Sequence, residues 1–200
     1  MKFIIKQEEP QAWRDYKRTP GVEFQAIPEL KASLLQEQGY LCCYCMSQIN
    51  SERMKVEHFK PRRYADLIMN YANLFAACTG NFCSDKHCDT RKEDEEIVIN
   101  PTDARNNCEQ IIGYFSNGKI SYPPNYYRDV VEILNLNNSV LISNRRAALL
   151  GAALAIKKAN YNRAFITRMI QGYSEKDENS KFKPYCNAIL WLLRKKLSVN

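Results

Sequence analysis

The sequence predicts a mainly helical α+β protein whose central segment is organised by zinc. Three observations predict this class. Six of the eight cysteines fall between positions 42 and 88, helix-type patterns occupy both ends of the chain, and two β-rich runs surround Asn117-Gly118. The chain therefore divides into an N-terminal helical segment (1–39), a zinc-organised centre (40–103) and a hairpin followed by a helical region (104–200).

The N-terminal segment carries two predicted helices. The stretch Gln11 to Lys17 places Trp13 and Tyr16 at helical spacing. Pro28 suits the first position of a helix, which should run through Gln38 and end at Gly39.

The centre has a less regular pattern. Residues 54–59 alternate enough to predict a short strand, and residues 88–95 predict a helix that has Asp89 near its start. Few apolar runs separate the cysteines, so we expect little apolar core between residues 40 and 103. Ligation of a metal would then supply much of the stability of this segment.

The last part of the chain begins with a predicted β-hairpin over residues 110–122, because Asn-Gly favours a tight turn. From Tyr127 onward the pattern is helical, with a long Ala-rich helix over Ser139 to Ala159 and a second helix over Asn160 to Tyr173. A polar loop (175–181) precedes a last helix that starts at Lys183-Pro184. We expect most apolar faces of these helices to be core, and an exposed one would mark a docking surface.

Composition narrows the class of protein. The chain is 45% hydrophobic with a net charge of +7, which is ordinary for a globular protein and permits a polyanionic partner. No run of 18 uncharged apolar residues suggests a membrane span, and the N-terminus lacks the pattern of a secretion signal. The expected location is the cytoplasm, where clustered cysteines indicate metal ligands rather than disulfides.

The cysteines predict one Cys₄ zinc site. Cys42 and Cys45 form a C-x-x-C pair, and a second cluster begins 33 residues after Cys45. We favour Cys78 and Cys88 as the second pair, with Cys83 as the alternative to either, and expect Cys43 to point away. Cys108 and Cys186 stand alone in apolar surroundings and should belong to the core.

Both histidines of the chain, His58 and His87, lie within the segment framed by these cysteines. His58 follows Glu57 and precedes Pro61 by three residues. The piece Asn73-Leu74-Phe75-Ala76-Ala77-Cys78 comes fifteen residues later, and Cys88-Asp89-Thr90-Arg91-Lys92 follows.

The order C-x-x-C, E-H-x-x-P, N-L-x-x-x-C and C-(N/D)-x-x-K resembles the HNH endonucleases of the type whose ββα-metal fold is stiffened by a Cys₄ zinc. The resemblance covers residues 42–92. A weaker likeness, through INPTD (99–103), NGKI and ILNLNNSVLISNRR (133–146), extends to the HNH component of retron and Septu-type anti-phage defence systems.

The resemblance implies a role for each residue. His58 would be the general base, Asn73 would hydrogen-bond across the loop and orient it, and Glu57 with Asp89 would hold Mg²⁺ or Mn²⁺. Basic side chains would contact phosphates: Lys55, Lys60, Arg62, Arg63 and Lys92. The substrate would be DNA, and the partners an ABC-type ATPase subunit and, as a further candidate, a retron reverse transcriptase with its msDNA.

One point of geometry follows. Glu57 and His58 are adjacent and would face opposite ways on an ideal strand, so a shared site requires a twist, a bulge or a strand end there.

The chain also departs from the family pattern. Many family members carry Asp where this chain has Glu57, and Asn or His where it has Asp89. The ten-residue step from Cys78 to Cys88 contains an insert, and His87 is the alternative to Asp89 for the third HNH position.

Other readings of the same residues remain open. Glu57-His58 is also a plausible structural pair, Asn73 a turn residue, Asp89 a helix cap, and the basic run a solvated face. The alternative function is a non-catalytic zinc-knuckle module that binds nucleic acid or protein as a scaffold subunit. Charge alone gives affinity for phosphates and does not distinguish DNA from RNA.

Overall fold

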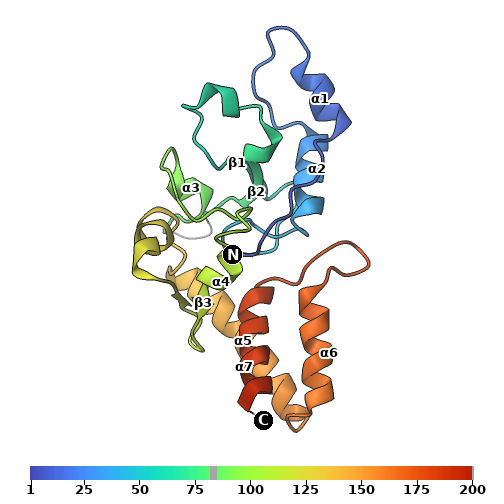
Figure 1. The fold of residues 1–200 in the computed structure, drawn as a ribbon, viewed down its shortest axis with the longest axis vertical. Coiled ribbons are helices and arrows are strands. Elements are labelled where there is room, and N and C mark those ends of the chain that lie inside the picture. Colours follow the sequence, from blue (N-terminus) through green and yellow to red (C-terminus); the bar gives the residue numbers. More distant parts are fainter. Residues whose placement is uncertain (82–84, 200) are drawn as a thin grey trace.

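The computed structural model describes residues 1–81 and 85–199 (Figure 1). Cys83, the alternative zinc ligand, lies outside these residues. The described fold is α+β and mainly helical, as predicted. The N-terminal helices α1 (Gln11–Lys17) and α2 (Pro28–Glu37) lie beside a small sheet, while the C-terminal helices gather at the opposite end of the molecule.

The sheet of the centre consists of β1 (Met54–His58) and β2 (Leu74–Cys78), which pair antiparallel with Met54 opposite Cys78 and His58 opposite Leu74. The short helix α3 (Asp89–Lys92) follows. The pattern along the chain predicts β1 but gives no alternation for β2, because all five residues of β2 are buried.

Helix α2 is tied to the edge of β2 by the side chain of Gln38. This amide donates to the Ala76 carbonyl at 2.8 Å, and its oxygen accepts from the Ala76 N–H at 2.7 Å. Gly39, with φ of +60°, then turns the chain toward the first cysteines, which confirms the predicted end of the helix.

The expectation of little apolar core in the centre is wrong. Residues of segment 40–103 contribute many members of one continuous core, among them Tyr44, Phe59, Leu74, Phe75 and Ile99. Two short continuous runs, 41–46 and 74–78, supply more than half of these core residues, and both runs contain cysteines that were assigned to the metal. Apolar packing therefore holds this segment together to a greater extent than expected.

The predicted hairpin forms, although it is shorter than expected. Residues 108–111 make the small helix α4 (Cys108–Ile111), and the strands are β3 (Gly113–Tyr114) and β4 (Ile120–Ser121). Gly118 in the turn has φ of +88°, and a Cβ there would lie 2.3 Å from the Ile142 carbonyl oxygen. The turn thus packs against the next long helix at a distance that only glycine permits.

Three helices complete the chain: α5 (Ser139–Lys158), α6 (Arg163–Ser174) and α7 (Cys186–Val199). Figure 1 shows α6 and α7 side by side, with α5 running along α7. Cys108 and Cys186 are buried in the core, as predicted.

By length and composition, α5 is apolar enough to cross a membrane, which the count of uncharged residues did not suggest. In this fold, however, its Arg145 is fully buried and donates to the Gly118 and Leu136 carbonyls, each at 2.7 Å. Those bonds join α5 to the hairpin and to the chain before it.

Candidate active site and metal centre

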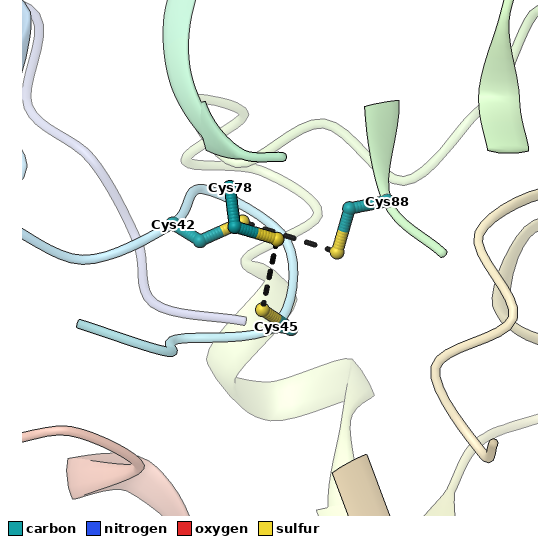
Figure 2. Close-up of side chains that lie close together, drawn as sticks. All are labelled: Cys42, Cys45, Cys78 and Cys88. Carbon is teal, nitrogen blue, oxygen red and sulfur yellow. Dashed lines mark hydrogen bonds between the residues drawn. The ribbon is translucent and has the colours of Figure 1, made fainter. Parts of the chain in front are cut away.

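Four thiols meet at one point in the centre of the molecule (Figure 2). The sulfur atoms of Cys42, Cys45, Cys78 and Cys88 all lie within 4.8 Å of one another, and all four residues are buried. Cys42 and Cys45 come from a knuckle, Cys78 ends β2, and Cys88 immediately precedes α3. The predicted four ligands are therefore the ones that the fold brings together.

The distances suit zinc. Sulfur atoms about 2.3 Å from a tetrahedral zinc ion are about 3.8 Å apart. The Cys45 and Cys78 sulfurs are 3.8 Å apart, and the Cys42 and Cys88 sulfurs are 3.9 Å apart. Cys43 is not part of the cluster, as predicted.

The ionisation of the cluster also calls for a cation. Burial opposes ionisation of Cys42, yet hydrogen bonds from the surrounding thiols lower the pKa of Cys42 well below its usual value. Burial and the interactions with the other cysteines raise the pKa of Cys88 well above its usual value. The cluster favours one thiolate and resists a second unless a positive ion joins it.

Local backbone geometry places the ligands. An isolated bridge between Leu41 and Gln48 closes the knuckle, and Met46 turns the chain with φ of +62°. Cys88 has φ of +53°, and its N–H donates to the Leu134 carbonyl at 3.0 Å. Cys78 is thus the last residue of β2, and Cys88 directly precedes α3.

A cleft of about 730 Å³ opens beside the sheet. Glu57, His58 and Asp89 all line it, together with the basic residues Lys55 and Arg62. β1 ends at His58, which is the strand end that a shared site for Glu57 and His58 requires.

Glu57 and Asp89 form a carboxylate pair at this cleft. Burial, and then a hydrogen bond with the Asp89 carboxyl, raise the pKa of Glu57 well above its usual value although Lys92 opposes the shift. Two oxygen-donor groups that share a proton fit a hard divalent cation. Among the described residues no third acidic, histidine or cysteine ligand joins them in a cluster, so water and substrate would complete the coordination of a cation.

The structure favours Asp89 over His87 for the third position. Asp89 begins α3 and lines the cleft, while His87 is fully buried and does not line it. Gly80 approaches the chain at His87 so closely that a Cβ would lie 2.1 Å from the His87 carbonyl oxygen.

His58 is held as a neutral imidazole. Its Nε2 lies 3.1 Å from the Ile68 carbonyl oxygen and must donate to it, while its Nδ1 accepts from Arg62 Nε at 3.4 Å. Burial, followed by the charge of Arg62, lowers the pKa of His58 to about 4. Nδ1 is therefore unprotonated near neutral pH and faces the side on which Arg62 lies.

Asn73 closes the loop between β1 and β2. Its side-chain oxygen accepts from the Lys60 N–H at 2.7 Å, and its amide donates to the Lys60 carbonyl at 2.9 Å and to the Leu67 carbonyl at 3.2 Å. These are hydrogen bonds across the loop, of the kind that the resemblance implies. They fix the chain two residues after His58.

The expectation that Lys92 contacts a phosphate is wrong. Its side chain is fully buried, and its ammonium donates to Glu57 at 2.9 Å and to the His58 carbonyl at 3.1 Å. A group used in this way cannot contact a substrate phosphate. Lys92 instead ties α3 to the end of β1.

The other basic residues differ in position. Lys55 and Arg62 line the cleft, with Lys55 3.4 Å from Asp89, whereas Lys60 and Arg63 lie outside its lining and pair with Glu96. All four are exposed enough to meet a large substrate.

Sequence reasoning missed two side chains of the site. Tyr44, within the knuckle, donates from its hydroxyl to Glu57 at 2.7 Å and so links the thiol cluster to the carboxylate pair. Phe24, from the loop before α2, meets the His58 ring edge to face at 4.5 Å and lies 5.2 Å from the Arg62 guanidinium. Nothing near position 24 in the sequence signals this role, because it depends on how the N-terminal segment folds back.

Comparison with curated proteins points to one class, the HNH-like nucleases of bacterial defence systems. The chain is 32% identical over 118 residues to the Septu protein PtuB of Bacillus thuringiensis. That match covers 55% of this chain and 42% of the Septu protein, so it spans less than half of that relative.

A second relative is named the retron Vc95 putative HNH endonuclease, from Vibrio cholerae serotype O1 biovar El Tor. It is 24% identical over 159 residues, which are 72% of this chain and 76% of that protein. No family model matches the chain. The two relatives confirm the resemblance that the motifs predict.

Proposed function

We propose that this protein is a metal-dependent HNH endonuclease that hydrolyses DNA as the effector subunit of an anti-phage defence complex. The observation that carries the proposal is the meeting of His58, Glu57 and Asp89 in one cleft beside a four-cysteine cluster. The two relatives, one a Septu protein and one named as an HNH endonuclease, support it.

Each cofactor has a proposed place. Zn²⁺ would be held by the four cysteines and would be structural, because all four ligands are protein thiols and the cluster is buried. Glu57 and Asp89 would hold Mg²⁺ or Mn²⁺. Such a cation, when bound, neutralises charge on the scissile phosphate and on its leaving oxygen.

The chain's own residues would carry out the proton transfer. Once Arg62 gives up its contact with His58 Nδ1, that nitrogen takes a proton from the attacking water, whose oxygen forms the new bond to phosphorus. The bond to the 3′-oxygen breaks, the leaving oxygen takes a proton from a solvent water, and the products carry a 5′-phosphate and a 3′-hydroxyl. Nε2–H, bonded to the Ile68 carbonyl, keeps the ring oriented while its other nitrogen is charged.

The test is plasmid cleavage with Mg²⁺ or Mn²⁺ by the wild type and by His58→Ala. We expect the variant to lose about 100-fold or more of the rate. Asp89→Asn should lose activity as well, while Asp94→Asn, an acid that lines the same cleft, serves as its control. Equal cleavage by wild type and His58→Ala removes the catalytic assignment.

Metal titration separates this function from its alternative. Calorimetry of the zinc-loaded protein with Mn²⁺ should reveal one weaker site that Glu57→Gln and Asp89→Asn abolish. A protein that holds zinc without such a site would instead be a zinc-knuckle module that binds nucleic acid or protein.

We also propose a cytoplasmic complex with an ABC-type ATPase subunit, to which a retron system would add a reverse transcriptase with its msDNA. The support in this chain is an apolar stripe on α5 (Ala147, Leu150, Gly151 and Leu154), all exposed and one helical turn apart. Leu150 and Leu154 are each 56% exposed. An exposed apolar helix face typically marks a protein contact.

Co-expression with a candidate ABC-type ATPase tests the assembly. The pair Leu150→Glu and Leu154→Glu should abolish co-purification, while Gln171→Glu on the exposed surface of α6 should preserve it. Retention of the ATPase by the double variant would place the contact elsewhere.

A further inference from the structure

One carboxylate gathers three donors from the chain that follows β1. Glu96 accepts from Lys60 Nζ at 2.7 Å, from the Tyr64 hydroxyl at 2.6 Å and from the Arg63 guanidinium at 2.5 Å. These donors come from one short segment (60–64), and Glu96 lies more than thirty residues further along the chain.

The three donors have the composition of a phosphate site. A guanidinium, an ammonium and a hydroxyl all donate to oxyanions, and arginine pairs with carboxylate and phosphate through the same geometry. The Tyr64 ring lies under both cations, 5.9 Å from Lys60 Nζ and 5.4 Å from the Arg63 guanidinium carbon. The donors would therefore remain grouped without the carboxylate.

The backbone around Glu96 is held by contacts that do not involve the three donors. Arg128 donates to the Glu96 carbonyl at 2.9 Å, and Asp129 accepts from the N–H groups of Val98 and Ile99 at 2.7 and 2.8 Å. On the other side, Asn73 clamps the backbone of Lys60. Release of the side-chain contacts would therefore leave both segments in place.

These contacts are also easy to exchange. The side chains of Lys60, Arg63 and Glu96 are between 33% and 52% exposed. Exposed ion pairs of this kind contribute little net stability and give way to a competing anion. The hydrogen bonds from Lys60, Tyr64 and Arg63 lower the pKa of Glu96 to about 2, so it is an anion at neutral pH.

Neighbouring arginines point to different places. Arg62 lines the cleft at His58, while Arg63 is not part of the lining and donates to Glu96 and to the Asp94 carbonyl. A nucleic-acid strand whose scissile phosphate lies at Arg62 would pass beside the group formed by Lys60, Arg63 and Tyr64.

We propose that Lys60, Arg63 and Tyr64 form a binding site for a DNA backbone phosphate next to the cleft, and that Glu96 occupies this site as an internal competitor until DNA displaces it. The proposal rests on the proposed function and adds a residue that restrains DNA binding. Glu96 would thus weaken DNA binding, whereas ion-pair networks are usually assigned a role in stabilising the fold.

The experiment measures binding of a fluorescent 20-base-pair duplex DNA to the zinc-loaded full chain, without added Mg²⁺ or Mn²⁺. Glu96→Gln is compared with Glu95→Gln. The control removes the same charge from the neighbouring residue, whose carboxylate pairs with Arg128 and not with the three donors. We expect Glu96→Gln to bind about three- to tenfold more tightly, with a steeper dependence on salt, and Glu95→Gln to change by less than about twofold.

A combined variant identifies the donors. Adding Arg63→Ala to Glu96→Gln should cancel the gain, whereas Arg105→Ala, an exposed arginine outside this network, should not. If every variant binds DNA and Glu96→Gln equals or falls below Glu95→Gln, the inference is overturned while the proposed function stands. If no variant binds DNA at any salt concentration, both are overturned.

Discussion

The ammonium group of Lys92 lies 2.9 Å from a carboxylate oxygen of Glu57, and the side chain of Lys92 is fully buried while that of Glu57 is 2% exposed at the cleft. The cation therefore sits behind the carboxylate pair, on the side away from the cleft. It balances the charge of an acidic residue that the fold could not otherwise bury.

Removal of this cation should destabilise the protein. Lys92→Met leaves Glu57 buried without its partner, and we expect the free energy of unfolding to fall by about 3 kcal/mol. Lys55→Met removes the partner of Asp89 at an exposed position and should cost less than about 1 kcal/mol. Urea unfolding of the two variants makes the comparison, and equal losses would contradict the buried pair.

The thiol cluster predicts a clear separation between neighbouring cysteines. Cys42→Ser should lose bound zinc and lower the free energy of unfolding by several kcal/mol, while the buried Cys43→Ser should keep its zinc. The centre also has apolar core, so the Cys42 variant should keep part of its helical signal. Elemental analysis with thermal melting checks this, and a native zinc content in Cys42→Ser would rule the cluster out.

The two histidines can be titrated separately by NMR. The pKa of His58 should be about 4, since burial and Arg62 both disfavour its charged form. Arg62→Gln and Phe24→Ala should each raise it toward 6.5. In the wild type the contribution of His58 to stability is complete above pH 6.5 and is lost as the pH falls toward 4. A wild-type value near 6.5 would contradict the buried, Arg-capped ring.

The loop after β1 depends on Asn73. Asn73→Ala loses three hydrogen bonds, so we expect a loss of about 2 kcal/mol in stability and a fall in cleavage rate with little change in DNA binding. Asn70→Ala, which removes the cap from the adjacent turn, is the control for stability alone. If both variants cleave equally well, Asn73 has no positioning role.

Much of the fold could be predicted because its signals are local. Pro28 and Gly39 mark the ends of α2, and Asn117-Gly118 marks the hairpin turn. The pairing of Cys42 and Cys45 with Cys78 and Cys88 also followed from spacing and chemistry. For the helix and the turn a few neighbouring residues carry the information, and for the cysteines the spacing within each pair does so.

The rest depends on contacts between distant segments. β2 is buried on both faces and shows no alternation, and the burial of Lys92 follows from the packing of α3 against β1. The place of Phe24 beside His58 depends on the path of the N-terminal chain. No local pattern in the sequence encodes such meetings, because each requires the finished tertiary structure.

The backbone hydrogen bond from Cys88 to Leu134 connects the thiol cluster to the chain before the C-terminal helices. Leu134 lies in the chain that leads into α5, and Asn135 beside it holds the Lys86 carbonyl at 3.0 Å. A displacement of the chain before α5 would therefore act on Cys88, the residue that precedes Asp89. Because Asp89 directly follows Cys88, the position of the chain before α5 helps to set the position of that acidic residue.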